Sequence, residues 1–326
     1  MTDFHPTVLI AGIVAGATPI LLATIGETIT EKSGLINLSL DGSIMLSAMT
    51  AFAVSYETSS LMLGFISAAL VGSLAALMVA VFSIYLKQSQ VAVGFVLTLM
   101  LRDLAYFLGN PYSRLQGPSL TPLPIPLLSR IPFFGEVLFS HNMTVYLSIM
   151  LIILCWWYMY RTPHGLILRS VGENPRACFA RGINPGAVQI LYAVTGGLFV
   201  GLAGAAFSLS TKPGWGRPQG AEGTGWIALA LVIFGGWHPV RAALGAYLFS
   251  FLQVLGIYLQ NWFPSVPTQV FQVAPFPLMI FTLVVINVIQ TEAVADWAEK
   301  KPVAKTVFRI FSGGMPLALG KTYRSD

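Results

Sequence analysis

Residues 60–86 read SLMLGFISAALVGSLAALMVAVFSIYL, an apolar run without a charged side chain. A helix needs about 20 apolar residues to cross the hydrocarbon core of a bilayer, so this run is long enough to span one. Comparable runs follow from end to end of the chain, at about 7–26, 38–56, 90–109, 142–160, 187–210, 241–262 and 271–290. The sequence therefore predicts an all-α, polytopic bundle of membrane-spanning helices.

One further run leaves the number of crossings open. Residues 225–236, GWIALALVIFGG, are too short for an ordinary span and are bounded by glycines. Such a segment is expected to be a broken or re-entrant helix in the protein interior. We therefore predict eight or nine transmembrane helices, and nine is the preferred count.

The composition agrees with a chain embedded in lipid. Of its 326 residues, 55% are hydrophobic and 10% are charged, whereas about a quarter are charged in soluble proteins. We predict one transmembrane domain, residues 1–290, with a cytoplasmic loop at 161–186, followed by a basic cytoplasmic tail, 291–326. The first residues, MTDFHPT, lack the basic region of a signal peptide, and the first apolar run is not followed by a small-residue cleavage pattern. The first helix is therefore expected to be retained.

The distribution of lysine and arginine predicts the orientation. Positively charged loops stay in the cytoplasm, which places the loop 161–186, the tail and the C-terminus inside. Thirteen cations then fall inside and four outside, and nine crossings put the N-terminus outside the cell inner (plasma) membrane. The net charge of +5 is thus read as a topology signal, and no nucleic-acid partner is expected.

Two other segments have a clear structural interpretation. The outer segment 110–141 contains six prolines, which resist helix formation, and is predicted to be an extended loop that caps the outer mouth. The helix at 187–210 is rich in small residues, among them Gly197, Gly201 and Gly204, which allow close helix packing.

The loop 161–189, RTPHGLILRSVGENPRACFARGINPGAVQ, contains the signals of a short isolated helix. Asn174 suits the N-cap, Pro175 the first helical position and Gly182 the C-terminal cap. A helix of about seven residues is unstable alone in water. We expect it to dock on its own membrane domain or on a cytoplasmic subunit, and an ordinary connecting loop is the alternative.

This loop resembles the coupling segment of ABC-importer permeases, in which a GENPxAAxxxGI pattern precedes a Gly-rich helix. Three more segments are similar to the nucleoside and simple-sugar branch of that family, which works with receptors of the basic-membrane-protein type. They are GETITEKSGLINLSLDGSIML (26–46), GTGWIALALVIFGGWHPVRAALGA (223–246) and GNPYSRLQGPS (109–119). The related branched-chain amino acid permeases share the first of these patterns, and a permease of that branch is the alternative within the same architecture.

The resemblance implies a permease subunit that translocates a small polar solute, a nucleoside or simple sugar. It also implies a cytoplasmic ABC ATPase, a second permease subunit (homologous or identical) and an extracytoplasmic solute-binding protein as partners, besides membrane lipid. Cofactors are expected to be absent from this chain, with ATP and magnesium on the ATPase. The residues of the expected ATPase contact are Glu173, Asn174, Pro175, Arg176, Phe179, Arg181 and Gly182.

Five residues are candidates for the translocation path: Asn37, Asp41, Arg102, Asp103 and Trp226. Asn37 and Asp41 stand in a polar break between two apolar runs, where stabilisation of the break is the alternative role; Asp41 replaces the family's usual Glu. Trp226 can stack on a ring or anchor the helix at the membrane interface.

Arg102 and Asp103 interrupt an apolar run, at positions where the family usually has small or uncharged residues. An ionised residue inside a membrane is costly unless it is paired or faces water. Neighbours on a helix point about 100° apart, so we expect no direct pairing, and at least one should face the subunit interior. Lining the solute path and a structural or interfacial role both remain open.

Catalytic signals are weak. Gly314, Gly320, Lys321 and Thr322 differ from a phosphate-binding loop because five residues, and not four, separate the glycines. No metal site or hydrolase constellation is expected, so ATP hydrolysis is assigned to another polypeptide.

His238 precedes a proline in a predicted cytoplasmic turn and is expected to contact solvent or the ATPase. An ion-coupled secondary transporter is the alternative from another class.

Overall fold

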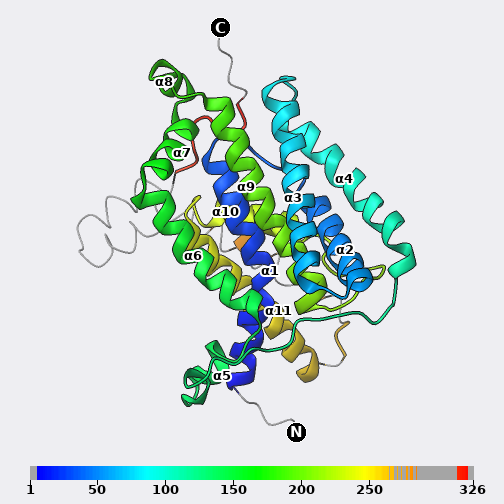
Figure 1. The fold of residues 1–326 in the computed structure, drawn as a ribbon. Coiled ribbons are helices and arrows are strands. Elements are labelled where there is room, and N and C mark those ends of the chain that lie inside the picture. The colour runs from blue at the N-terminus through cyan, green and yellow to red at the C-terminus, as the bar shows by residue number, and fades with distance from the viewer. Residues whose placement is uncertain are drawn as a thin grey trace, which may run out of the picture.

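The computed structural model describes residues 6–263, 265–267 and 314–321, together with single positions between 270 and 284. Regular secondary structure in this part of the chain is entirely helical (Figure 1). The long helices are α1 (Pro6–Lys32), α2 (Leu40–Thr58), α3 (Leu61–Ile84), α4 (Gln90–Gly109), α6 (Met143–Arg161), α9 (Pro185–Ala206) and α11 (Pro239–Trp262). The short ones are η1 (Asn110–Tyr112), η2 (Leu128–Arg130), α5 (Phe134–Leu138), α7 (Pro163–Glu173), α8 (Pro175–Ala180), η3 (Phe207–Thr211) and α10 (Thr224–Phe234).

Six of the described helices are long and apolar enough to cross a membrane: α1, α3, α4, α6, α9 and α11. α2 has 19 residues but carries more polar side chains, and most of it is buried inside the bundle. α10 has the short length predicted for the ambiguous run. The predicted count of eight or nine crossings is therefore not confirmed, and the run 271–290 and the tail 291–326 lie largely outside the described residues.

Side-chain caps explain where several helices begin. Ser89 accepts a hydrogen bond from the backbone of Ala92 at the start of α4, and Thr162 accepts one from Gly165 at the start of α7. Such bonds satisfy backbone donors that have no partner within the first turn of a helix. Proline occupies the first position of α7, α8, α9 and α11, where its missing N–H costs nothing.

Small residues hold the centre of the bundle together, as predicted for the sixth apolar run. An added Cβ at Gly201 would lie 2.2 Å from the Ala68 carbonyl of α3, and one at Gly204 would lie 2.6 Å from the Ile44 carbonyl of α2. α9 therefore packs against two neighbours at backbone-to-backbone distance, which is typical of membrane helices.

We expect Gly72→Ala to destabilise the bundle. Its Cβ would lie 2.3 Å from the Gly197 carbonyl, and backbone on both sides leaves no flexible atom to move. Overpacking of this kind costs about 1–3 kcal/mol. Gly12→Ala is the matched control, since nothing lies within 4 Å of a Cβ there. Melting temperatures of the two purified variants check the prediction, and equal values would contradict it.

The two ends of the bundle differ in chemistry. One end, which we call the charge-rich end, gathers the break between α1 and α2, helices α7 and α8, the turn 235–238 and residues 314–321; in Figure 1 it lies at the top. The opposite, proline-rich end holds residues 110–142 and 207–223, and the first described helix begins there.

The proline-rich segment crosses its end of the bundle, as expected for a cap. Leu120 donates to the Leu209 carbonyl (2.8 Å), and Arg114 donates to that of Trp215 (2.9 Å). It is not extended throughout, because η1, η2 and the five-residue α5 interrupt it. Prolines stand between these short helices and limit their length.

Candidate functional site

The predicted short helix of the coupling segment is present as α8. The Asn174 side chain accepts a hydrogen bond from the Ala177 backbone (3.0 Å), and Pro175 follows it at the first helical position. Gly182 ends the helix with φ +80°, a conformation that favours glycine. α8 projects from the charge-rich end (Figure 1), and Phe179 on it is 54% exposed.

The rest of this loop is more ordered than the sequence indicated. Residues 163–173 form α7, which buries Leu168 and Val171 and leaves Leu166 exposed. Reading 161–186 as a loop with one short helix missed this element. Its capping threonine and following proline were the available signal, at positions 162 and 163.

Backbone contacts join this coupling segment to the α1–α2 break. A Cβ at Gly172 would lie 2.1 Å from the Lys32 carbonyl. Ala318 donates to the Gly172 carbonyl (2.9 Å), and Gly320 donates to that of Gly34 (3.2 Å). Residues 314–321 thus lie between α7 and the break and connect α7 with the end of α1.

Several hydrogen bonds hold the polar break, although Glu27 Oε2 and the side-chain nitrogen of Asn37 are buried without a hydrogen-bond partner among the described residues. Gly34 has φ +94°, and Asn37 donates its backbone N–H to Glu27 Oε1 (2.9 Å). The Asn37 side-chain carbonyl in turn accepts from both the backbone and the hydroxyl of Ser39. Asn37 is 1% exposed. This geometry agrees with the alternative role, stabilisation of a helix break, and its place in the path stays a prediction.

Asp41 lies where the short α10 meets α2. Its Oδ1 accepts from the Gly225 backbone (3.1 Å), and the side chain is buried. At the other end of α10, the Trp237 indole donates to the Glu31 carboxylate. Two buried carboxylates therefore hold the two ends of α10, a contact that spacing along the sequence could not indicate.

α4 presents an unusual face to its surroundings. Its exposed residues occur in neighbouring pairs that repeat every four positions, and together they form a stripe that is apolar except at Asp103. The stripe consists of Val91, Ala92, Phe95, Val96, Leu99, Met100, Asp103, Leu104, Phe107 and Leu108. Trp226 of α10 is 39% exposed and its ring lies 6.5 Å from that of Phe95, so it extends the stripe. Among the exposed large side chains of α3, all are apolar.

The expectation that Arg102 and Asp103 do not pair is wrong. Arg102 Nε lies 3.8 Å from Asp103 Oδ1, because the long arginine side chain folds back across the turn that separates the two Cα–Cβ directions. Their side chains are 38% and 76% exposed. The pair lies at the surface of the subunit and not inside it.

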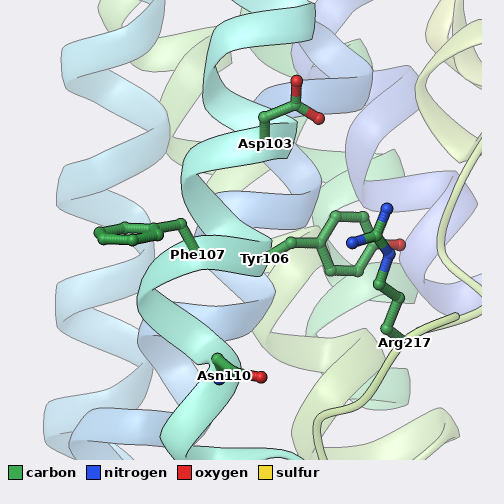
Figure 2. A pocket seen from close by; sticks show the side chains of 5 residues that line it. All are labelled: Asp103, Tyr106, Phe107, Asn110 and Arg217. Atoms are coloured by element: carbon green, nitrogen blue, oxygen red, sulfur yellow. The ribbon is translucent and has the colours of Figure 1, made fainter.

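A cavity of about 500 Å³ opens beside this pair, towards the proline-rich end. Its lining comes from α4, η1 and the 207–223 segment: Asp103, Tyr106, Phe107, Asn110 and Arg217 (Figure 2). The Arg217 guanidinium lies 4.8 Å from the centre of the Tyr106 ring, and the Tyr106 hydroxyl donates to Glu222. In Figure 2 the Phe107 ring points to the opposite side of α4 from Tyr106.

Glu222 fixes the loop behind this cavity. It accepts from the backbone N–H of Gln219 (2.9 Å) and of Gly220 (2.5 Å), besides the Tyr106 hydroxyl. Burial raises the pKa of Glu222, but these donors outweigh burial and leave its pKa below the ordinary value. A fixed carboxylate thus orients the aromatic floor of the cavity. Sequence reasoning did not assign Glu222 this role.

His238 is half-buried, so it is less solvated than predicted, and its contact with the ATPase stays a prediction. Its ring stacks on Tyr160 with centroids 5.0 Å apart, and Tyr160 also carries the Arg169 guanidinium at 4.9 Å. Burial lowers the pKa of His238 to about 4, and the nearby charges of Arg241 and Lys32 act in the same direction.

This depressed pKa predicts a pH dependence of stability. Between about pH 6.5 and pH 4 the unfolded chain binds a proton at this histidine that the folded chain does not. The contribution of the neutral His238 to the free energy of unfolding is therefore fully present above pH 6.5 and declines as the pH falls. We expect the melting temperature to drop more between pH 7.5 and pH 5 in the wild type than in His238→Gln. Parallel curves for the two proteins would contradict it.

The membrane-spanning bundle, the exposed α8 and the cavity beside α4 define a multi-pass membrane permease. The sequence matches the family described as branched-chain amino acid transport system / permease component over residues 9–283. The chain belongs to this family. It is a permease subunit and no enzyme, in a class that assembles with a separate ATPase and a solute-binding protein.

Three relatives cover most of the chain. A Haloferax volcanii protein, provisionally named a glucose ABC transporter permease, is 34% identical over 78% of this chain and 78% of its own. The nucleoside ABC transporter permease protein NupC of Lactococcus lactis is 30% identical, over 90% and 95%. The guanosine ABC transporter permease protein NupQ of Bacillus subtilis is 30% identical, over 85% and 91%. No solved structure matches the chain.

Proposed function

We propose that this chain forms the membrane path of an ATP-driven importer for a nucleoside or simple sugar. The observation that carries the proposal is the set of relatives, which align with most of the chain and are named for nucleosides, guanosine and glucose. The motifs at 26–46 and 223–246 support the same branch. Branched-chain amino acids remain the second candidate because the family as a whole is described by them.

The cavity beside α4 suits such solutes. Tyr106 offers an aromatic ring on which a base or sugar ring can stack, while Asp103 and Asn110 offer acceptors and donors for hydroxyl groups. A branched aliphatic side chain would leave these polar groups without partners, which is costly. The lining therefore favours a ring with hydroxyls over leucine or valine.

The stripe on α4 supports a second permease subunit, homologous or identical. An exposed carboxylate in mid-helix is unfavourable against lipid, and Asp103 is 76% exposed in the single chain. A partner facing α4 would remove the stripe from lipid and enclose a polar path between the two subunits, with Arg102, Asp103 and Trp226 along it.

The charge-rich end is proposed to face the cytoplasm of the inner membrane, with the N-terminus outside. Residues 173–182 would then contact the ABC ATPase, which binds ATP and magnesium, while the solute-binding protein delivers solute at the proline-rich end. The basic loop 161–186 and the positive-inside rule support this orientation. Closure of the ATPase would push α8 and open the path outward.

Uptake measurements test the solute class. We expect proteoliposomes containing the complete importer to accumulate radiolabelled guanosine or glucose when ATP and magnesium are inside, and not labelled leucine. Accumulation of leucine alone would replace the proposal by its second candidate. Uptake by this chain without an ATPase would favour the ion-coupled alternative.

A further inference from the structure

A second cavity, of about 610 Å³, lies at the charge-rich end, beneath α8. We call it the cationic groove, and its charged lining consists of Lys32, Arg169, Arg181 and Glu173. Three cations face one carboxylate. Within the described residues, no carboxylate oxygen lies within 4.0 Å of a nitrogen of these three cations. Glu173 and Arg181 also belong to the segment proposed to contact the ATPase, whereas Lys32 and Arg169 have no role in the proposed transport mechanism.

Two of the cations are held in place by the fold. Lys32 ends α1 and is 9% exposed, although its side chain carries a charge. Arg169 lies over the Tyr160 ring, and its buried Nε has no hydrogen-bond partner. A buried donor without a partner costs free energy. The groove is thus prepared for an acceptor group with negative charge.

The surroundings place the groove at a membrane–water boundary. It adjoins the end of α6, where Trp157 is 51% exposed and Arg161 lies over the Trp156 ring, the composition of an interfacial belt. α7 forms one wall and turns Leu166, which is 57% exposed, away from the bundle core. Figure 1 shows α7 at the periphery, beyond the end of α6.

We propose that the cationic groove binds the phosphate group of an anionic phospholipid. Lysine and arginine at a membrane surface attract anionic headgroups, and basic pockets between helices select them. The volume of about 610 Å³ is sufficient for a phosphoglycerol headgroup, and the exposed Leu166 lies where an acyl chain would leave the groove. Such a lipid would brace α7 against α1 at the base of α8.

Thermal unfolding of the purified full chain in detergent, followed through its seven tryptophans, tests this proposal. Phosphatidylglycerol should raise the melting temperature more than phosphatidylcholine, whose phosphate is balanced by a cation. In titrations, Arg169→Gln and Lys32→Gln should each weaken the apparent affinity for phosphatidylglycerol about fivefold, and Arg169→Lys should retain most of it. Lys87→Gln, an exposed cation at the same end of the bundle, is the matched control.

Arg181→Gln, at an exposed position, repeats the test should the buried variants not fold. If inorganic phosphate alone raised the melting temperature as much as phosphatidylglycerol, the groove would be a site for soluble phosphate and not for a lipid. Equal effects of the two lipids, or an unchanged titration in Arg181→Gln and Arg169→Gln, would overturn the proposal. So would a loss of ATPase binding in these variants with lipid binding intact, which would make the groove a protein contact.

Discussion

Phe179→Ala in α8 is expected to weaken ATPase binding strongly and to lower solute uptake and solute-stimulated ATP hydrolysis by the assembled importer. The residue is 54% exposed on a helix of six residues that projects from the bundle. Aromatic anchors at the centre of an interface contribute about 2 kcal/mol or more, so truncation should lower ATPase affinity at least tenfold. ATPase assays and uptake in proteoliposomes, with and without solute, measure the effect.

The structure provides a matched control for this substitution. Phe134 is also 54% exposed, but it begins α5 at the proline-rich end. Phe134→Ala should therefore leave ATP hydrolysis unchanged, and both variants should keep the wild-type melting temperature. Removal of residues 174–181 is the stronger form of the test. Solute-linked hydrolysis that survives this deletion would show that force enters the permease elsewhere.

The sequence was sufficient for the helices but not for how they pack. Apolar run length predicted α1, α3, α4, α6, α9 and α11, because lipid fixes the length of a spanning helix. Local rules also predicted α8, since a cap, a proline and a glycine lie within nine residues. These signals depend on neighbours in the chain and therefore survive without tertiary information.

Contacts between segments that are far apart in the chain could not be predicted from the sequence. Asp41 and Gly225 are 184 positions apart, and the indole of Trp237 meets Glu31 across 206. The short α7 was missed because its 11 residues make only about three turns, too few for its apolar pattern to stand out from a loop. Arg102 and Asp103 were judged from backbone directions alone, whereas the flexible arginine side chain allows the ion pair.

Arg102→Ala is expected to lower the rate of solute uptake at least tenfold without affecting assembly. The substitution removes the partner of Asp103, which lies in the exposed stripe of α4 and lines the cavity beside it. A carboxylate left without its cation beside the cavity changes the charge that the solute meets on its path. Initial rates over a range of solute concentrations distinguish a higher KM from a slower turnover.

Asp103→Ala should have an effect of similar size, since it leaves the arginine alone, and the exchange Arg102→Asp with Asp103→Arg should restore part of the activity. Leu104→Ala is the matched control because Leu104 lies on the same stripe, 37% exposed, and carries no charge. Partial recovery in the exchange variant would show that uptake requires the ion pair and not one side chain alone, and wild-type melting temperatures of all three variants would exclude a purely structural role. Unchanged kinetics in Arg102→Ala would mean that the stripe faces something other than the solute, and the second permease would then have to meet a different face of this chain.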